Sequence, residues 1–150
     1  MVTAYEQLDK RLAALKPLAK TVRPSRGWVR AIRETLGMTT RQMGVRLGVS
    51  QPWVIQLEKN EVDGSITLES LEKAAQALGC RVVYALVPEK PLGDTIRERA
   101  SLLAERKLAS VEQTMRLEDQ AVRDDARRKE GRQRLIDELL KKPARLWDDP

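Results

Sequence analysis

The segment from Thr40 to Lys59, which reads TRQMGVRLGVSQPWVIQLEK, constrains the fold of this chain more than any other. Gly44 provides the small residue that two closely approaching helices need, and Gly48 can adopt the positive φ of a tight turn without steric cost. Three apolar residues at helical spacing face a common core: Val49, Val54 and Leu57. The pattern predicts two short helices, Thr40–Leu47 and one from Ser50 to about Asn60, packed across a turn.

Helix signals flank this pair on both sides. Thr39 is a good N-cap for the helix that follows it, and Gln42 completes a capping box. Residues 27–36 predict a helix before the pair, and residues 67–78 predict one after it. The apolar face expected for the helix at 27–36 consists of Trp28, Ile32 and Leu36.

The stretch Arg81–Val87 (RVVYALV) is apolar and rich in β-branched residues, and Gly79 and Pro88 bound it. It predicts one short β-strand. A lone strand leaves its backbone groups unpaired, and the same strand in a second copy is the simplest partner. Five residues are therefore assigned to dimerisation: Val82, Val83, Tyr84, Ala85 and Leu86. The alternative is an apolar stretch that packs on the helices without pairing.

Both ends of the chain are also expected to be helical. Residues 3–16 begin with a possible capping box of Thr3 and Glu6. After a hinge over residues 88–93, a long helix is predicted from Asp94 or Thr95 to about Lys129, with Gly131 as its break and a short helix over 135–140. Its apolar stripe consists of Ile96, Ala100, Leu103, Leu108, Val111, Met115, Ala121 and Val122.

The narrow stripe of this C-terminal part leaves two alternatives open. The helices drape over a partner protein, or they pack inside the chain against residues 3–19. The predicted organisation is an N-terminal helix and basic linker (1–26), a DNA-binding domain with its strand (27–87) and a C-terminal helical extension (88–150). The fold class is mainly α.

An ordinary αα-hairpin shares the glycine and the apolar spacing, but five matched positions in Thr40–Lys59 favour a helix-turn-helix. The stretch LGMTTRQMGVRLGVSQPWVIQLEKNE, followed by TLESLEKAAQALG, resembles the domain of the Xre and lambda-repressor group. This resemblance covers about Gly27 to Leu78 and implies a five-helix-type, lambda-repressor-like domain. Thr40 stands where that group usually has Gln.

A second resemblance covers nearly the whole chain. The stretches RGWVRAIRETLGM, TLESLEKAAQALGCRVVYALVP, MRLEDQAV and RLWDD resemble the family called mobile mystery protein A. Such proteins are typically encoded beside a Fic-domain protein, mobile mystery protein B, in a pairing that resembles a toxin–antitoxin operon. The resemblance implies that this chain is an autorepressor and antitoxin with a Fic-domain partner.

In a helix-turn-helix, the second helix enters the major groove with its N-terminal residues at the base edges. This predicts four base-reading residues: Ser50, Gln51, Trp53 and Gln56. Gln51 is the best candidate for specificity, because a Gln amide pairs with N6 and N7 of adenine. A solvated amide is the alternative for Gln51, and packing in a dimer is the alternative for Trp53.

Five residues are predicted to contact phosphates: Arg23, Arg26, Thr40, Arg41 and Lys59. Thr40 and Arg41 open a helix whose N-terminal N–H groups suit an anion. Arg23 and Arg26 precede a helix and either hold the DNA backbone or belong to a solvated linker. A homodimer with two reading helices about 34 Å apart would recognise a palindromic operator in double-stranded DNA.

Composition limits the remaining functions. The net charge is +6, and residues 1–36, with eight basic and three acidic side chains, carry +5 of it. Such a charge suits a polyanion. The absence of His excludes imidazole catalysis and His metal sites, and a single cysteine, Cys80, excludes an internal disulfide. We expect that the chain is not an enzyme and that it has no cofactor, metal site or membrane span. We also expect a cytoplasmic protein at the nucleoid. For a single free cysteine such as Cys80, burial is the commoner fate.

Two further hypotheses about function stay open. Residues 37–90 carry six basic and six acidic side chains, and this neutrality mildly favours a protein-interaction module whose helix-turn-helix has lost DNA binding. The stretch SLLAER at 101–106 partly resembles the Ser/Thr-x-x-x-Glu-Gly/Asn helix that silences some Fic proteins, with Arg106 in place of the last residue. That resemblance would assign Glu105 to blocking the γ-phosphate of ATP.

Overall fold

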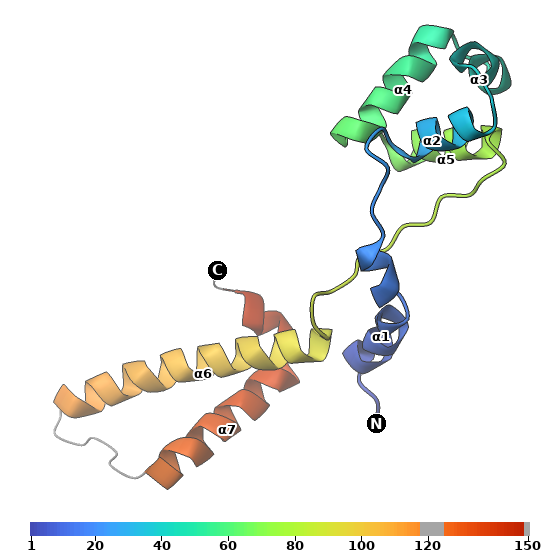
Figure 1. Ribbon diagram of the computed structural model, residues 1–150. Coiled ribbons are helices and arrows are strands. Elements are labelled where there is room, and N and C mark those ends of the chain that lie inside the picture. Colours follow the sequence, from blue (N-terminus) through green and yellow to red (C-terminus); the bar gives the residue numbers. More distant parts are fainter. Residues whose placement is uncertain (118–124, 149–150) are drawn as a thin grey trace. The chain divides into compact units, whose positions relative to one another are not determined.

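The computed structural model of the chain describes residues 1–117 and 125–148 (Figure 1). The chain divides into two compact units. The helix-turn-helix unit consists of residues 17–86, and the hairpin unit consists of residues 1–16 with the described part of 87–150. The first unit is therefore inserted into the sequence of the second, so that the chain passes from one to the other twice.

Four α-helices form the helix-turn-helix unit, all of whose residues are described: α2 (Trp28–Thr35), α3 (Thr40–Leu47), α4 (Gln51–Asp63) and α5 (Leu68–Ala77). The core of this unit consists of Val29, Met43, Val54, Leu57, Ala74 and Leu78. Val49 is partly buried against this core, so the three predicted inward residues are confirmed. The mainly helical fold is confirmed too, but the five-helix count is wrong, because the chain after α5 is irregular.

The turn between α3 and α4 is built as predicted. A Cβ atom on Gly44 would lie 2.8 Å from the carbonyl oxygen of Val49, so the two helices approach too closely for any other residue. Gly48 ends α3 in the left-handed conformation with φ 70°. The capping box also forms: the N–H of Gln42 donates to Oγ1 of Thr39 at 3.1 Å, and the N–H of Thr39 donates to Oε1 of Gln42 at 2.9 Å.

Helix α2 turns only part of the predicted face to the core, because Ile32 packs against the core but its two predicted neighbours do not. Trp28 and Leu36 are exposed, and the buried residues of this helix are Val29 and Arg33. Apolar spacing alone assigns an arginine to solvent. Here the Arg33 guanidinium is paired with the carboxylate of Glu58, which compensates for the loss of water.

Helix α4 ends at Asp63, later than predicted, and takes up the first part of the expected loop. The reason is the buried side chain of Glu61. Its carboxylate accepts hydrogen bonds from the N–H groups of Trp28 at 2.6 Å and Val29 at 2.8 Å. It thereby caps α2, whose own N-cap residue, Gly27, has no side chain to do so.

The predicted strand at Arg81–Val87 is not found, and the described residues of the chain contain no strand. A strand requires a neighbouring backbone to pair with, and no backbone hydrogen bond joins 81–87 to the rest of the described chain. The segment is irregular instead. The residues assigned to dimerisation thus have no strand in this structure, and Val83, Tyr84, Ala85 and Leu86 are exposed, whereas Val82 is half-buried.

The hairpin unit contains α1 (Ala4–Ala13), α6 (Leu92–Leu117), α7 (Asp125–Lys141) and the short 3-10 helix η2 (Pro143–Trp147); another 3-10 helix, η1 (Lys16–Lys20), lies at the border of the units. Helices α6 and α7 pack side by side. Their core with η2 consists of Ala100, Ala104, Ile136 and Leu146. Helix α1 begins with the predicted capping box of Thr3 and Glu6.

Helix α6 begins at Leu92, ahead of the predicted start at Asp94 or Thr95. The carboxylate of Asp9, on α1, accepts hydrogen bonds from the N–H groups of Leu92 at 2.6 Å and Gly93 at 3.0 Å. A negative charge at a helix N-terminus is favourable. The cap therefore comes from a residue distant in sequence rather than from the helix itself.

Gly131 does not interrupt the C-terminal helices, as the sequence predicted, but lies within α7. A glycine inside a helix costs about 1 kcal/mol, which packing of the same helix against α6 can offset. The predicted course of the long helix through Ala121 and Val122 lies outside the described residues, as does the side chain of Met115.

Candidate nucleic-acid interface

The N-terminal half of α4 presents the predicted base-reading residues. Gln51, Trp53 and Gln56 are exposed, while Val54 on the opposite side is fully buried. Ser50 occupies the N-cap position, but its side chain makes no capping hydrogen bond. Its hydroxyl is therefore available to an outside partner, and the polar end of α4 faces away from the core.

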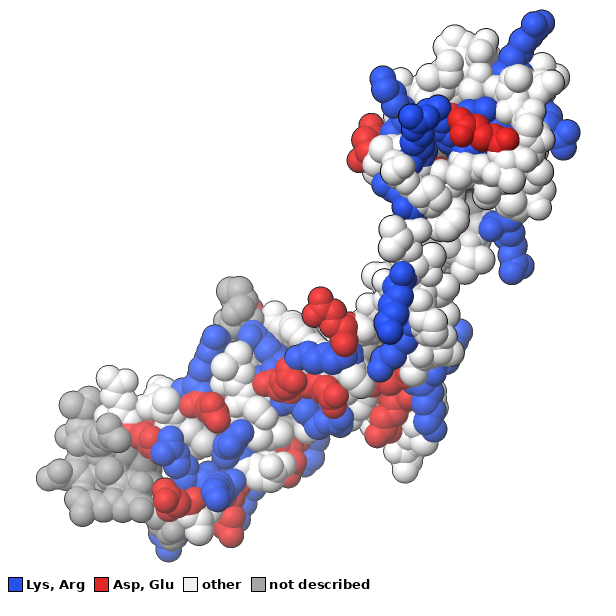
Figure 2. Space-filling view, in the orientation of Figure 1, with Lys and Arg blue, Asp and Glu red and all other residues white. Residues whose placement is uncertain are grey.

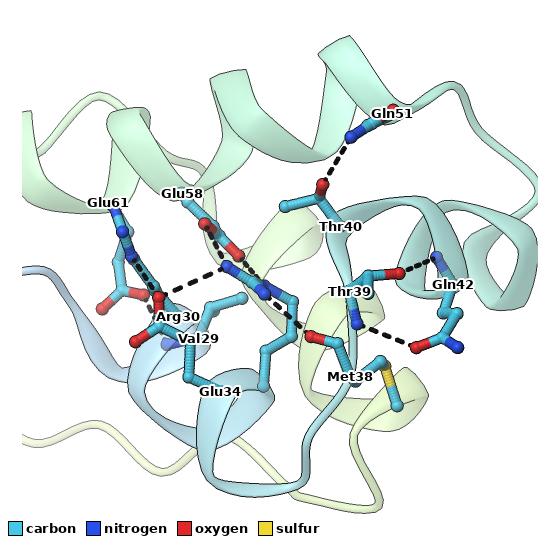
Figure 3. A network of polar contacts seen from close by, with 11 residues as sticks. Val29, Arg30, Glu34, Met38, Thr39, Thr40, Gln42, Gln51, Glu58 and Glu61 are labelled. Atoms are coloured by element: carbon cyan, nitrogen blue, oxygen red, sulfur yellow. Dashed lines mark hydrogen bonds and ion pairs between the residues drawn. The ribbon is translucent and has the colours of Figure 1, made fainter.

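Thr40 and Gln51 lie together where α3 and α4 begin. Nε2 of Gln51 donates a hydrogen bond to Oγ1 of Thr40 at 2.9 Å (Figure 3). The two residues are eleven positions apart in the sequence, so the turn between the helices brings them together. The contact fixes the direction of an otherwise flexible and exposed amide.

Trp53 and Gln56 border a hollow between α4 and the beginning of α5. The other residues that line this hollow include Asn60, Ser65 and Thr67. Nε2 of Gln56 donates to Oδ1 of Asn60 at 2.8 Å, which holds the Gln56 side chain along the helix axis. Gln56 is thereby oriented from within α4, whereas Gln51 is oriented from α3.

A second hollow of ≈ 740 Å³, here called the basic hollow, borders the other side of α4. Four basic side chains line it, against two acidic ones, Glu58 and Asp63; the basic ones are Arg26, Arg30, Arg33 and Lys59. Thr40, Ile55 and Gln56 line it as well. Figure 2 shows basic side chains gathered on the visible face of the helix-turn-helix unit, with acidic side chains beside them. The basic hollow therefore joins positive charge to the exposed side of α4.

Arg30 lines the basic hollow but was not predicted from the sequence. Its Nε donates to Oε1 of Glu34 at 2.8 Å (Figure 3). This hydrogen bond raises the pKa of Arg30 and lowers the pKa of Glu34. The spacing of four residues between them was the available signal, but it indicates a surface ion pair and not a binding site.

The five predicted phosphate contacts are only partly brought together. Three of them line the basic hollow: Arg26, Thr40 and Lys59. Arg41 is exposed on the first turn of α3 and is not part of that lining. Arg23 is directed to the end of α4, where it donates to the carbonyl oxygens of Glu61 at 2.6 Å and Val62 at 3.1 Å. Arg23 therefore stabilises the end of the helix.

The buried pair of Arg33 and Glu58 holds α2 against α4. The guanidinium donates to both carboxylate oxygens, at 2.5 Å from Nε and 3.2 Å from Nη2. Nη1 of Arg33 also donates to the carbonyl oxygen of Met38 at 2.8 Å. One buried cation thus ties α2 to α4 and to the turn that precedes α3.

Two other residues singled out from the sequence do not line the hollows described above. Cys80 is exposed and so does not follow the commoner fate of a free cysteine. Glu105 lies on α6, where its carboxylate forms an ion pair with Arg132 of α7 at 3.4 Å. The role assigned to Glu105 stays a prediction.

Residues 29–84 match the family model HTH_3, described as helix-turn-helix. The match covers α2 from Val29 on, α3, α4, α5 and part of the segment that follows. It confirms the Xre- and lambda-repressor-like motif and supports a DNA-binding regulatory domain. No curated protein and no solved structure matches the chain. Among the described helices, none combines the length and the apolar character needed to span a membrane.

Proposed function

We propose that this chain is a sequence-specific DNA-binding transcription regulator that reads its operator with the N-terminal half of α4. The observation that carries the proposal is the pair of Gln51 and Thr40, an oriented amide at the exposed start of the second helix of the motif. The match to a helix-turn-helix family supports it.

The geometry of Gln51 suits adenine. An amide nitrogen carries two hydrogens, and the bond to Thr40 uses one of them. The second hydrogen of Nε2 can donate to N7 of adenine, while Oε1 accepts from the N6 amino group. A held amide loses less side-chain entropy on binding than a free one, so the contact with Thr40 also favours affinity.

The basic hollow suits the DNA backbone beside the reading helix. Arg26, Arg30 and Lys59 supply positive charge there, and Arg41 lies on the first turn of α3, where N–H groups favour a phosphate. These contacts would position the protein without reading sequence. Arg23 is left out of the proposed contacts because α4 already uses it.

The experiment is fluorescence anisotropy with duplex DNA from upstream of the gene and with scrambled DNA of equal composition, over a salt series. The variants are Gln51→Ala and, as a matched control, Gln76→Ala, which truncates an exposed glutamine on α5. We expect the native chain and Gln76→Ala to prefer the upstream DNA. Gln51→Ala should lose that preference by on the order of 1–3 kcal/mol, equal to about 5- to 150-fold.

The native chain could instead bind both duplexes equally, with a steep dependence on salt. Such binding would be non-specific attraction to phosphates and would contradict the proposal. Absence of binding would favour the second candidate, a protein-interaction module. The balance of six basic and six acidic residues over 37–90 is the observation that favours that candidate.

The finer proposal is that the chain is an autorepressor and antitoxin, a homodimer on a palindromic operator, with a Fic-domain protein as partner. It rests on the resemblance to mobile mystery protein A. Co-expression tests it: the chain should co-purify with the Fic-domain protein of the adjacent gene and relieve its toxicity. A Fic-domain protein that neither binds the chain nor loses toxicity would leave only the DNA-binding role.

A further inference from the structure

The helix-turn-helix unit has an apolar groove between α2 and α5, with a volume of ≈ 370 Å³. The described residues that line it include Trp28, Ile32, Leu71, Ala75, Leu78, Val82 and Val83, with Arg81 as the one charged residue among them. The residues that line the basic hollow and the hollow beside Trp53 are all different from these. The groove is therefore a second surface, separate from the proposed DNA contacts.

The chain segment that forms one side of the groove continues as a run of exposed apolar residues. Val83 is 70% exposed, Tyr84 69% and Leu86 80%, and Trp28 across the groove is 45% exposed. No backbone hydrogen bond within the described chain holds residues 81–87 in place. Exposed apolar residues gathered beside an apolar groove are typical of a binding site.

We propose that this surface binds a second copy of the chain. Around a two-fold axis, Tyr84 and Leu86 of each copy pack against the groove of the other. Such a contact requires a projecting part and a receiving part on the same surface, because the same patch must serve both copies. The exposed run 83–86 and the groove beside it are those two parts. The interface rests on side-chain packing and requires no strand.

The exposed apolar area agrees with a dimer. An aromatic side chain buries on the order of 150–250 Å². The exposed parts of Trp28 and residues 83–86 would then bury roughly 400 Å² per copy, or roughly 800 Å² in a pair, which is most of the ~1,000 Å² that a specific interface has to exceed. The lining of the groove itself adds to this area.

Charge points to the same partner. Each copy carries a net charge of +6, so two copies repel each other unless they meet where charge is sparse. The groove, with Arg81 alone among its described lining residues carrying charge, is such a place. The basic hollow is not, because it gathers Arg26, Arg30 and Lys59. This dimer deepens the homodimer of the proposed function but does not depend on DNA binding.

The test is sedimentation velocity of the full chain without DNA, from about 1 to 100 µM. The variants are the double substitution Tyr84→Lys with Leu86→Lys and the control Val45→Lys, a 78% exposed apolar residue of α3 outside the groove. We expect the native chain and the control to form dimers and the double variant to sediment as a monomer. The association constant of the double variant should be at least 100-fold lower than that of the native chain. All three should have the same circular dichroism, because the substituted side chains are exposed.

Hydrogen exchange at high and low protein concentration provides a second measurement. Residues 81–87 should exchange slowly only at concentrations where the chain is dimeric. A native chain that stays monomeric, or a double variant that still forms dimers, would overturn the proposal. So would slow exchange of 81–87 in the monomer, because it would show that another segment of the same chain covers the groove.

Discussion

The two units of this chain are both helical but are held together by different kinds of contact. The helix-turn-helix unit combines an apolar core with buried carboxylates: Glu58 pairs with Arg33, and Glu61 caps α2. The hairpin unit has an apolar core whose buried members are alanines, Ile136 and Leu146, and its ion pairs lie at the surface. Helices as short as α2 and α3 are not stable alone, so apolar packing and polar contacts between helices both hold them.

This difference separates the functions of the two units as well. In the helix-turn-helix unit, the polar contacts that stabilise the fold also border the proposed DNA surface, since Glu58 and Arg33 line the basic hollow. In the hairpin unit, Ala100 and Ala104 stand one turn apart on α6 and serve packing alone. Substitutions in the two cores should therefore affect DNA binding very differently.

The largest effect is expected for Glu58→Ala. It leaves the guanidinium of Arg33 buried without its partner, which costs about 3–5 kcal/mol. Amide hydrogen exchange in urea should show a destabilised helix-turn-helix unit and an unchanged hairpin unit. DNA affinity should fall with it.

The matched control is Glu69→Ala, which removes the exposed partner of Lys73 on α5. Exposed pairs contribute about 0–1 kcal/mol, so this change should be small. If Glu58→Ala destabilised both units equally, the two would form one cooperative body and the comparison would be wrong.

The second effect concerns the hairpin unit. Leu146 is fully buried, and Leu146→Ala should cost about 2–5 kcal/mol through the cavity it leaves. Near-ultraviolet circular dichroism of Trp147, which lies under the guanidinium of Arg99, reports the loss. The control Leu102→Ala truncates an exposed leucine of α6. DNA affinity should not change, and a parallel loss of affinity would show that the hairpin unit takes part in binding.

The third effect is on specificity. Thr40→Val keeps the shape of the side chain but removes the oxygen that accepts the hydrogen bond of Gln51. A hydrogen bond contributes about 0.5–1.5 kcal/mol, so preference for the upstream DNA should fall about 2- to 12-fold. Thr40→Ser should keep it. Equal loss in both variants would mean that Thr40 contributes its methyl group and not its hydroxyl.

The smallest effect is on pH dependence. Hydrogen bonds from the hydroxyl of Ser65 and from its N–H lower the pKa of Asp63 below its usual 3.8. The ionised form is favoured in the folded state, so this stabilisation is present above pH 3.8 and is lost as the pH falls through the lowered pKa. NMR titration of the Asp63 carboxyl carbon measures it, and Ser65→Ala should raise the pKa toward the usual value. A native pKa at or above 3.8 would contradict the contact.

The helix-turn-helix unit was predictable because its signals are local. Gly44, Gly48 and the pair of Thr39 and Gln42 act within a few residues of one another, and the structure confirms each of them. The buried face of α2 was not predictable in this way. Arg33 is buried because of Glu58, 25 positions later, and apolar spacing cannot detect such a partner.

The hairpin unit was predicted less well for the same reason. The start of α6 is set by Asp9, 83 positions earlier in the sequence, and Gly131 is accommodated within α7. The strand at 81–87 was inferred from β-branched residues, which favour a strand only when a neighbour exists. In each case a local preference was outweighed by a distant contact or by the lack of one.

In the candidate site, too, the sequence predicted residue types, whereas the contacts between them became known only from the structure. Gln51 and Thr40 were both predicted, and the structure joins them by a hydrogen bond that the sequence does not reveal. Arg23 was predicted as a phosphate contact, but its guanidinium binds the carbonyl oxygens at the end of α4. Arg30 was missed because its spacing from Glu34 is that of an ordinary surface pair. Residue type predicts which side chains can bind DNA, and the fold decides which are available.

The proposed function requires that the oriented amide of Gln51 reads a base. The most direct measurement is an NMR titration of the full chain with upstream duplex DNA, following the side-chain amide signals of its glutamines. We predict a large shift of the Gln51 signals with upstream DNA, a small one with scrambled DNA, and no change at Gln133 of α7. Gln51 signals that stay in place while the DNA binds would contradict it.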